Sequence, residues 1–357
     1  MLQINEKIID ELNNKNSSDN DIAILYVQNL DSKNLPALLS FEHLSKILEI
    51  NPDALAAMCC SQHDFYNTFY IPKRSGGLRK IDAPLPSMYS AQKFILDNII
   101  KNLSYCSKSS TAYIKDSSIK EHVLKHLNQN FLFKLDIKNF FPSITVSKIF
   151  GLLEEVGYKK DVANILANLL TLMGTLPQGA PISPHLSNIV SYKMDIDLRE
   201  YCDRNNLIYS RYADDLVISG FSFNEENKKI IESIVQECGF EINIKKLKLY
   251  SPEEPIRRLT GLILNKDKVR IPKNTRRKIR QMYFYVEKYL LIDLGLIQNH
   301  RSLKKEFNLT DPIILERLVG YLNFWIWIEP DSIYAKNTLQ AINDYKFSFS
   351  ALASGSK

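Results

Sequence analysis

The spacing of apolar residues divides the N-terminal third of the chain into a helical start, a two-stranded segment and a further helix. From residue 1 to about 64, apolar residues recur every three or four positions, as in LPALLSFEHLSKILEI, and this period predicts helices. In FYNTFYIPKRSGGLRKIDAP (65–84), aromatic and basic residues alternate around Ser75-Gly76-Gly77, which predicts two strands joined by a turn. The segment MYSAQKFILDNIIKNL (88–103) has the period of another helix.

Helical and strand-like patterns alternate through the centre of the chain. FLFKLDI (131–137) is a short apolar run, as expected of a strand that is buried on both faces. IYSRYADDLVISG (208–220) contains two strand-like runs around a tight turn, and GFEINIKKLKLY (239–250) and RRLTGLILNKDKVRIP (257–272) are also predicted strands. Helices are predicted between these strands and again after Pro272, so the pattern indicates an α+β protein. The central helices are expected at 148–158, 160–173, 185–205 and 227–238.

Composition indicates a folded protein with a weak preference for anionic partners. Hydrophobic residues make up 45% and charged residues 24% of the 357 positions, which excludes disordered and fibrous chains. The 46 Lys and Arg outnumber the 40 Asp and Glu, and the net charge of +6 favours polyanions. No apolar run reaches the roughly 18 residues that span a bilayer, and the first residues lack the apolar core of a signal peptide. We therefore expect a cytoplasmic protein without a membrane partner.

Cysteine and histidine do not predict a metal or disulfide framework. The chain has an odd number of cysteines without C-x-x-C spacing, namely Cys59, Cys60, Cys106, Cys202 and Cys238. His122 and His126 lie four residues apart on a predicted helix, a spacing that zinc ligands also use, but no further ligand is evident.

Three carboxylates are the strongest candidates for chemistry. Asp214 and Asp215 lie at the predicted hairpin turn, where two adjacent carboxylates repel each other unless a cation neutralises them. An ordinary acidic β-turn is the alternative, since Asp is common in turns. Asp136 closes the apolar run FLFKLD, where a charge is costly unless it lies beside a metal or a partner. If these strands are neighbours in one sheet, the three carboxylates meet at one edge.

Such an edge would suit magnesium. Carboxylate oxygens are hard ligands, and Mg²⁺ accepts waters and phosphate oxygens as its remaining ligands. Two such ions about 4 Å apart would activate a 3′-hydroxyl and stabilise the pyrophosphate that leaves in an in-line displacement.

Five blocks in a fixed order resemble the palm motifs of reverse transcriptases, specifically the bacterial retron type. They are FKLDIKNFFPSI, LPQGAPISPHLSN, SRYADDLVISG, FEINIKKLK and RRLTGLILN. Upstream, IPKRSGGLRKIDAP and AYIKDSSIKEHVLKH resemble the fingers blocks, so the resemblance covers about residues 35–330. The chain departs from the retron pattern twice. Only His126 remains of the usual Asn-Ala-x-x-His, and Leu259 replaces Val in the Val-Thr-Gly block.

The resemblance implies the α+β fold of a right-hand polymerase. This fold has fingers, a palm with an antiparallel sheet and a short helical thumb, here with an N-terminal helical extension. We expect the extension at 1–64, the fingers at 65–130, the palm with part of the fingers inserted at 131–272, the thumb at 273–350 and a loose tail at 351–357.

The resemblance also implies a metal site and a gate for the sugar. The metal-binding positions are Asp136, Ile137, Asp214 and Asp215, for two Mg²⁺ ions. Phe141 matches the bulky residue under the incoming sugar, where an aromatic ring would exclude a ribose 2′-hydroxyl and favour dNTPs. Core packing is the alternative for Phe141, and it is the favoured interpretation for its neighbour Phe140.

Other positions match residues that contact the substrate in the family. Gln178 and Gly179 match the block beside the nucleotide and the template strand, although PQGAP alone would be only a loop. Lys246 matches a catalytic lysine that neutralises or protonates the departing pyrophosphate, with a solvated strand lysine as the alternative. Tyr212 is expected to pack on the primer end, and Arg211, on the opposite strand face, has no assigned role.

Basic residues in two regions are candidates for contacts with phosphate. In the fingers, Arg79 and, less specifically, Lys73 or Lys80 match the residues that hold the triphosphate, although any one alone would be read as surface charge. Near the thumb, residues 266–280 contain one acid, Asp267, and eight bases: Lys266, Lys268, Arg270, Lys273, Arg276, Arg277, Lys278 and Arg280. We expect the last four to face an RNA duplex, because proteins hold A-form helices mostly through phosphates and 2′-hydroxyls. A solvated helix face is the alternative.

The predicted function is RNA-templated DNA synthesis. By resemblance to retrons, the partners would be dNTPs, one cognate structured non-coding RNA that also supplies a priming 2′-hydroxyl, the RNA–DNA product, and an effector protein of an anti-phage defence system. One alternative is an abortive-infection polymerase that builds DNA without a template. Another is a non-catalytic RNA-binding scaffold, which the three carboxylates disfavour because a binder has no need of repelling charges.

Overall fold

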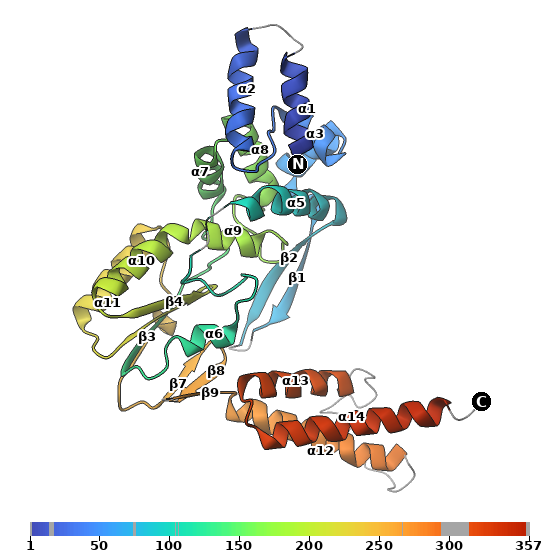
Figure 1. Ribbon diagram of the computed structural model, residues 1–357, viewed down its shortest axis with the longest axis vertical. Helices are drawn as coiled ribbons and strands as arrows, with labels where there is room; N and C mark the ends of the chain where they lie inside the picture. Colours follow the sequence, from blue (N-terminus) through green and yellow to red (C-terminus); the bar gives the residue numbers. More distant parts are fainter. Residues whose placement is uncertain are drawn as a thin grey trace. The chain divides into compact units, whose positions relative to one another are not determined.

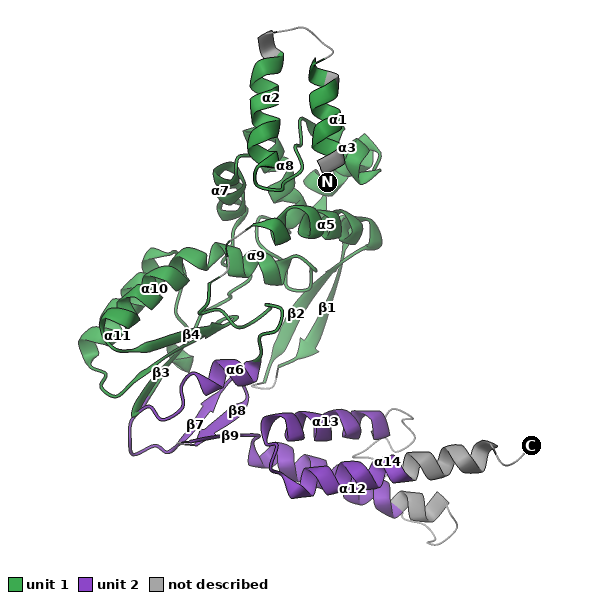
Figure 2. Ribbon diagram, viewed as in Figure 1, with its two compact units in different colours: residues 1–118, 130–249 green, residues 119–129, 250–357 purple. Residues whose placement is uncertain are grey.

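A computed structural model of the protein describes residues 2–13, 18–73, 76–103, 105, 107–265, 267–293 and 314–354. The chain divides into two compact units, residues 1–118 with 130–249 and residues 119–129 with 250–357 (Figure 2). These units do not coincide with the regions expected for extension, fingers, palm and thumb, whose boundaries stay predictions. Ser75, Cys106 and Lys266 lie outside the described residues.

The first unit begins with short helices, as the apolar period predicts. They are α1 (Leu2–Asn13), α2 (Ser18–Asp31), α3 (Phe41–Leu48), α4 (Pro52–Cys60) and the 3₁₀ turn η1 (Gln62–Phe65) (Figure 1). Ser40 begins α3 by accepting a hydrogen bond from the His43 N–H, and the Asn51 side chain accepts from the Asp53 N–H at the start of α4. Such caps satisfy N–H groups that have no partner within the helix.

The predicted basic hairpin is confirmed. Strands β1 (Tyr66–Pro72) and β2 (Leu78–Pro84) pair antiparallel with Tyr66 opposite Pro84, and most of their side chains are exposed. Helix α5 (Pro86–Asn98) follows, with the 3₁₀ turn η2 (Ile100–Asn102) at its end.

The central sheet has the strand order β4-β5-β3-β6. Its strands are β3 (Phe131–Asp136), β4 (Ile208–Tyr212), β5 (Asp215–Gly220) and β6 (Lys248–Tyr250), and β5 pairs antiparallel with both β3 and β4. The continuous strand expected over 239–250 was wrong. Asn243 donates its backbone N–H to the Asp136 carbonyl, and the chain then turns through the 3₁₀ segment η3 (Ile244–Lys246), so only Lys248–Tyr250 joins the sheet.

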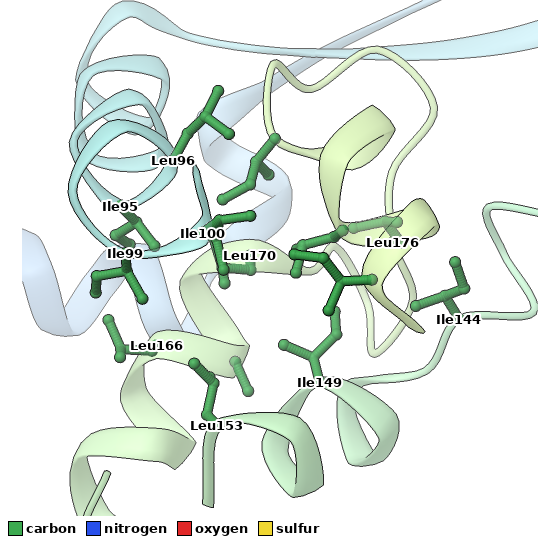
Figure 3. Close-up of a cluster of buried hydrophobic side chains, with 14 of the residues drawn as sticks. Ile95, Leu96, Ile99, Ile100, Ile144, Ile149, Leu153, Leu166, Leu170 and Leu176 are labelled. Atoms are coloured by element: carbon green, nitrogen blue, oxygen red, sulfur yellow. The ribbon is translucent and has the colours of Figure 1, made fainter. Parts of the chain in front are cut away.

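Further helices of this unit help to build its apolar core. They are α7 (Val146–Val156), α8 (Lys160–Leu170), α9 (Ser183–Val190), α10 (Tyr192–Arg204) and α11 (Glu225–Glu237), so the single helix expected over 185–205 is two helices that meet at Ser191. Side chains of α5, α7 and α8, among them Ile95, Leu153 and Leu170, gather in one buried cluster (Figure 3). The Leu176 N–H donates to the Ile144 carbonyl, which anchors the loop that carries Gln178.

The second unit combines a small sheet with helices. Helix α6 (Ile119–Leu124) packs on the antiparallel sheet β7 (Ile256–Leu259), β8 (Leu262–Asn265) and β9 (Lys268–Arg270). Helices α12 (Lys273–Asp293), α13 (Ile314–Ile328) and α14 (Ile333–Ser354) follow. Helix α14 continues into the segment expected to be a loose tail, because FSFSALAS contains few residues that break a helix. No helix in the described ranges combines the length and apolar character of a membrane span.

Candidate active site

The strand register brings the three candidate carboxylates to one end of the central sheet. Asp136, the last residue of β3, lies opposite Asp215, the first residue of β5, and Tyr212 of β4 lies opposite Asp215 on the other side. The Ile137 N–H donates to the Asp214 carbonyl at 2.9 Å, which fastens the hairpin turn to the end of β3. The expectation that the carboxylates meet at one sheet edge is therefore confirmed.

Two lysines and an asparagine contact these carboxylates. Lys246 Nζ lies 2.9 Å from both carboxylate oxygens of Asp136, and Lys134 Nζ lies 3.0 Å from Asp215 Oδ1. Asn243 Nδ2 donates to Asp136 Oδ1 at 3.2 Å. Lys246 is thus on a 3₁₀ turn and not on a strand, and its side chain is 54% exposed although it pairs with Asp136. Its catalytic function stays a prediction. Among the described residues, Asp214 has no ion pair.

Burial and mutual repulsion make the site receptive to a cation. Burial, followed by the charges of Asp136 and Asp215, raises the pKa of Asp214 to about 6, and burial also raises the pKa of Asp215. In the described part of the chain no cluster of acidic, histidine or cysteine side chains is preformed as a metal site. The lysine ammonium groups instead neutralise two of the carboxylates. Carboxylate oxygens are the ligands of a divalent cation such as Mg²⁺, and the raised pKa values show that these carboxyls lack full neutralisation. The bound cation would replace the contacts with the two lysines.

The raised pKa of Asp214 predicts a stability change that needs no substrate. Between about pH 4 and pH 6 the folded carboxyl keeps a proton that the unfolded chain has released, so the free energy of unfolding falls as the pH rises. Without divalent metal, Asp214→Asn should therefore stabilise the protein at pH 8, on the order of 2–3 kcal/mol, since one pKa unit corresponds to about 1.4 kcal/mol. The gain should vanish near pH 4. Chemical denaturation in the presence of a chelator at both pH values measures it.

An exposed aspartate provides the control for this prediction. Asp203→Asn, on the surface of α10, should show no gain at pH 8. A difference between Asp214→Asn and the wild type that stays the same at both pH values would contradict the burial argument.

Phe140 and Phe141 occupy different environments, as the sequence suggested. Phe140 is 5% exposed and belongs to the core, whereas Phe141 is half-buried. The Phe141 ring centroid lies 5.6 Å from that of Phe140 and 6.5 Å from that of Tyr113. The gate function of Phe141 stays a prediction.

Gln178 and Gly179 lie against the hairpin strand β2. The Asp82 N–H donates to the Gln178 carbonyl at 2.9 Å, and a Cβ at Gly179 would lie 2.7 Å from the Asp82 carbonyl oxygen. Gly179 also has φ +137°, which side chains disfavour. The close approach that requires glycine here is therefore to the backbone of β2, and contacts with a nucleotide stay a prediction.

The basic residues of the hairpin differ in their surroundings. Lys80 Nζ pairs with Asp82 Oδ1 at 3.0 Å, and Arg79 is exposed. The backbone N–H of Lys73 donates to the Gly77 carbonyl, which closes the turn. Contacts of these side chains with a triphosphate stay predictions.

Tyr113 is a site residue that the sequence analysis missed. Burial first, and then the charge of Asp214, raise the pKa of the Tyr113 phenol, while Arg79 and Arg211 lower it. Tyr113 thus lies within electrostatic reach of both the acidic turn and the basic hairpin. Its backbone has φ 63°, a strained value for a residue with a side chain, and such strain is frequent at functional sites. Tyr113 lies in the block AYIKDSSIKEHVLKH, which resembles the fingers of the family, but no role was assigned to it there.

In the second unit, the predicted RNA-binding residues lie at the start of α12. Arg277, Lys278 and Arg280 are exposed and Arg276 is half-buried. Lys278 Nζ lies 5.7 Å from the ring centroid of Tyr321, and the Arg280 guanidinium lies 4.8 Å from that of Tyr334. These two side chains therefore also hold α12 against its neighbours.

This unit contains a pair of tryptophans and a pair of histidines, each close together in the chain. Trp325 is 2% exposed and Trp327 is 43% exposed, so the two lie on different faces of α13. His122 and His126 are buried with their rings 5.9 Å apart.

Comparison with known proteins identifies the family. Residues 71–279 match the family model of reverse transcriptase (RNA-dependent DNA polymerase). The retron Ec86 reverse transcriptase of Escherichia coli is 30% identical over 71% of this chain and 79% of its own length, and the retron Ec83 reverse transcriptase of the same species is 29% identical over 78% and 90%. Among solved structures, apo telomerase from Candida tropicalis aligns with a TM-score of 0.47 and 13% identity. The alignment covers 81% of this chain and 58% of the telomerase chain.

The family model and the retron relatives confirm the predicted enzyme class and the α+β polymerase fold. The family model spans β2, the central sheet and the start of α12, and so includes every residue of the acidic site. The chain therefore belongs to the reverse transcriptase family, RNA-directed DNA polymerases, and is of the retron type.

Proposed function

We propose that this protein is the polymerase of a retron and makes DNA from dNTPs on one cognate structured non-coding RNA. The observation that carries the proposal is the position of Asp136, Asp214 and Asp215 at one end of the central sheet. It favours catalysis over RNA binding alone, because a scaffold has no need of clustered carboxylates that repel one another.

The acidic site would perform nucleotidyl transfer. Asp136, Asp214 and Asp215 would hold two Mg²⁺ ions, and the backbone carbonyl of Ile137 would be a further oxygen ligand. When bound, Mg²⁺ stabilises the negative charge on the attacking and departing oxygens. The primer hydroxyl would release its proton to water, and its oxygen would form a bond to the α-phosphorus of the dNTP while the bond from that phosphorus to pyrophosphate breaks. Lys246, which contacts Asp136, would neutralise or protonate the pyrophosphate.

The surrounding residues would orient the nucleotide and the primer. Phe141 would lie under the sugar and exclude a 2′-hydroxyl, and Tyr212 would pack on the primer end. Arg79 and Lys80 of β2 would hold the triphosphate, beside Gln178 and Gly179.

The retron relatives extend the proposal to the product and its partners. A 2′-hydroxyl of a guanosine in the RNA would prime synthesis, and the product would be a short DNA still joined to that RNA. The enzyme would work in the cytoplasm beside an effector protein in anti-phage defence.

One experiment tests this proposal directly. The protein is purified from its native host with the nucleic acid that it carries, and the nucleic acid is treated with RNase, with DNase and with a debranching enzyme. A branched RNA–DNA hybrid is the expected result. DNA without an RNA template would favour a template-independent polymerase, and RNA alone without DNA would favour a binding scaffold.

The basic start of α12 gives a prediction for RNA affinity. Replacing Arg276, Arg277 and Lys278 by Glu should weaken RNA binding and reduce its dependence on salt, because fewer counterions are released. Each lost phosphate contact lowers the slope of log K against log salt by roughly 0.7–0.9. Binding titrations of the RNA between low and moderate salt measure this slope.

A charge-matched variant is the control. Lys193, Arg204 and Lys229 are exposed basic residues of α10 and α11, and their replacement by Glu changes the net charge equally. It should leave the slope nearly unchanged. If both variants shift the slope alike, the start of α12 has no specific contact with RNA.

A further inference from the structure

A fully buried arginine precedes the acidic turn. Arg211 lies on β4, two residues before Ala213, and its side chain is 0% exposed. A buried guanidinium is costly unless its charge and its N–H groups are all paired. Its partners therefore indicate what this residue does.

One carboxylate neutralises the charge of Arg211. Arg211 Nε donates to Asp195 Oδ1 at 2.8 Å and Nη2 donates to Asp195 Oδ2 at 2.7 Å, so the contact is bidentate. Tyr209 donates its hydroxyl to the same Asp195 Oδ1 at 2.7 Å. Asp195, on α10, is also 0% exposed. This pairing leaves Nη1 of the guanidinium for other contacts.

Nη1 reaches the turn itself. It donates to the Ala213 carbonyl at 3.1 Å and to Asn188 Oδ1 at 3.2 Å. Ala213 has φ 57°, a left-handed conformation that residues other than glycine and asparagine adopt reluctantly. Its carbonyl belongs to the peptide group whose nitrogen is that of Asp214. The hydrogen bond therefore fixes the orientation of the peptide immediately before Asp214.

The backbone of Arg211 holds a second part of the site. Its N–H donates to the Ser109 carbonyl at 2.8 Å, and its carbonyl accepts from the backbone N–H and the hydroxyl of Thr111, both at 2.9 Å. Asn188 continues this connection by donating to the Ala112 carbonyl at 2.8 Å. The loop that leads to Tyr113 is thus tied to the same residue as the acidic turn.

We propose that Arg211 is a positioning residue for polymerisation, which holds the peptide between Ala213 and Asp214 so that the Asp214 carboxylate faces Asp136 and Asp215. The proposal rests on the function of Asp214 in the proposed reaction. Arg211 itself contacts neither substrate nor the reacting atoms in this assignment.

Arg211→Lys tests the proposal, because an ammonium can pair with Asp195 but cannot reproduce the fork that also reaches Ala213. Turnover should fall roughly tenfold to a hundredfold, as expected for the loss of a hydrogen bond from a charged donor. The KM for dNTP and the affinity for RNA should change less than about twofold. Amide hydrogen exchange in the peptide that contains residues 209–218 should become faster.

Tyr209→Phe is the matched control. It removes a hydrogen bond from Asp195 in the same buried network but leaves the contact between Arg211 and Ala213. We expect some loss of stability with wild-type turnover. If turnover in the two variants falls in proportion to their loss of stability, Arg211 acts only through folding and the proposal is wrong. Wild-type turnover in Arg211→Lys would also overturn it.

A second variant keeps the test informative if Arg211→Lys does not fold. This variant combines Arg211→Met, Asp195→Leu and Tyr209→Phe. It replaces the buried ion pair and the tyrosine hydroxyl that contacts it by apolar side chains, a change that often preserves folding. It should fold and lose turnover in the same range. Asp214→Asn, measured in parallel, separates the two proposals. An active Asp214→Asn would refute the proposed function, whereas an inactive Asp214→Asn with a fully active Arg211 variant would refute only the positioning role.

Discussion

Replacing Asp214 and Asp215 by Ala should abolish dNTP incorporation while leaving the protein folded and bound to RNA. The two residues would supply most of the charge that holds the divalent cations, and electrostatic stabilisation of the reacting oxygens is usually a large part of catalysis. We expect turnover to fall by at least about a thousandfold. Primer extension on an RNA template, with dNTP in excess and Mg²⁺ varied, measures the loss.

The two carboxylates should contribute unequally to stability, which provides a control for folding. Removing Asp214 removes a half-buried carboxyl that has no ion pair among the described residues, whereas removing Asp215 leaves the Lys134 ammonium, which is 20% exposed, without this partner. The single variant Asp214→Ala should therefore be at least as stable as Asp215→Ala in the absence of metal. Incorporation that persists in the folded double variant would refute the mechanism.

The sequence was sufficient to predict the acidic edge because strands have a simple period. Side chains alternate between the two faces of a strand, so an aspartate at the end of an apolar run and two aspartates at a hairpin turn must lie at strand ends. The pairing of β3 with β5 joins residues far apart in the chain, and only the order of the motifs indicated it. The structure supplied the register that places Asp136 opposite Asp215.

The contacts around this edge were less predictable, because they depend on tertiary structure. The segment 239–250 has the composition of a strand. However, the Asn243 N–H donates to the Asp136 carbonyl and Lys246 pairs with the Asp136 carboxylate, so the chain leaves the sheet there. Strand alternation predicts that Arg211 and Tyr212 point to opposite faces of β4. The partner of Arg211, however, is Asp195 of α10, and no local sequence pattern connects that helix to β4. The position of an arginine within a strand-like run was the one signal in the sequence, because an arginine buried in such a strand requires a carboxylate nearby.

Phe141→Ala should relax the choice between dNTP and rNTP. Under the proposed function, the phenyl ring occupies the volume that a ribose 2′-hydroxyl would need, and alanine leaves that volume open. The ratio of kcat/KM for dNTP to that for rNTP should fall by roughly a hundredfold, a typical range for discrimination by one small group. Single-nucleotide incorporation with each nucleotide in turn measures this ratio.

The neighbouring rings make this prediction specific to Phe141. Phe140→Leu changes a core ring 5.6 Å away and should lower stability without changing the ratio. The Tyr113 ring centroid lies 6.5 Å from that of Phe141, so Tyr113→Ala shows whether the tyrosine contributes to the selection. Both nucleotides are measured on the same enzyme, so a loss of folded protein cancels in the ratio. An unchanged ratio in Phe141→Ala would therefore remove the gate function from this residue, and a shift in Tyr113→Ala alone would assign it to the tyrosine.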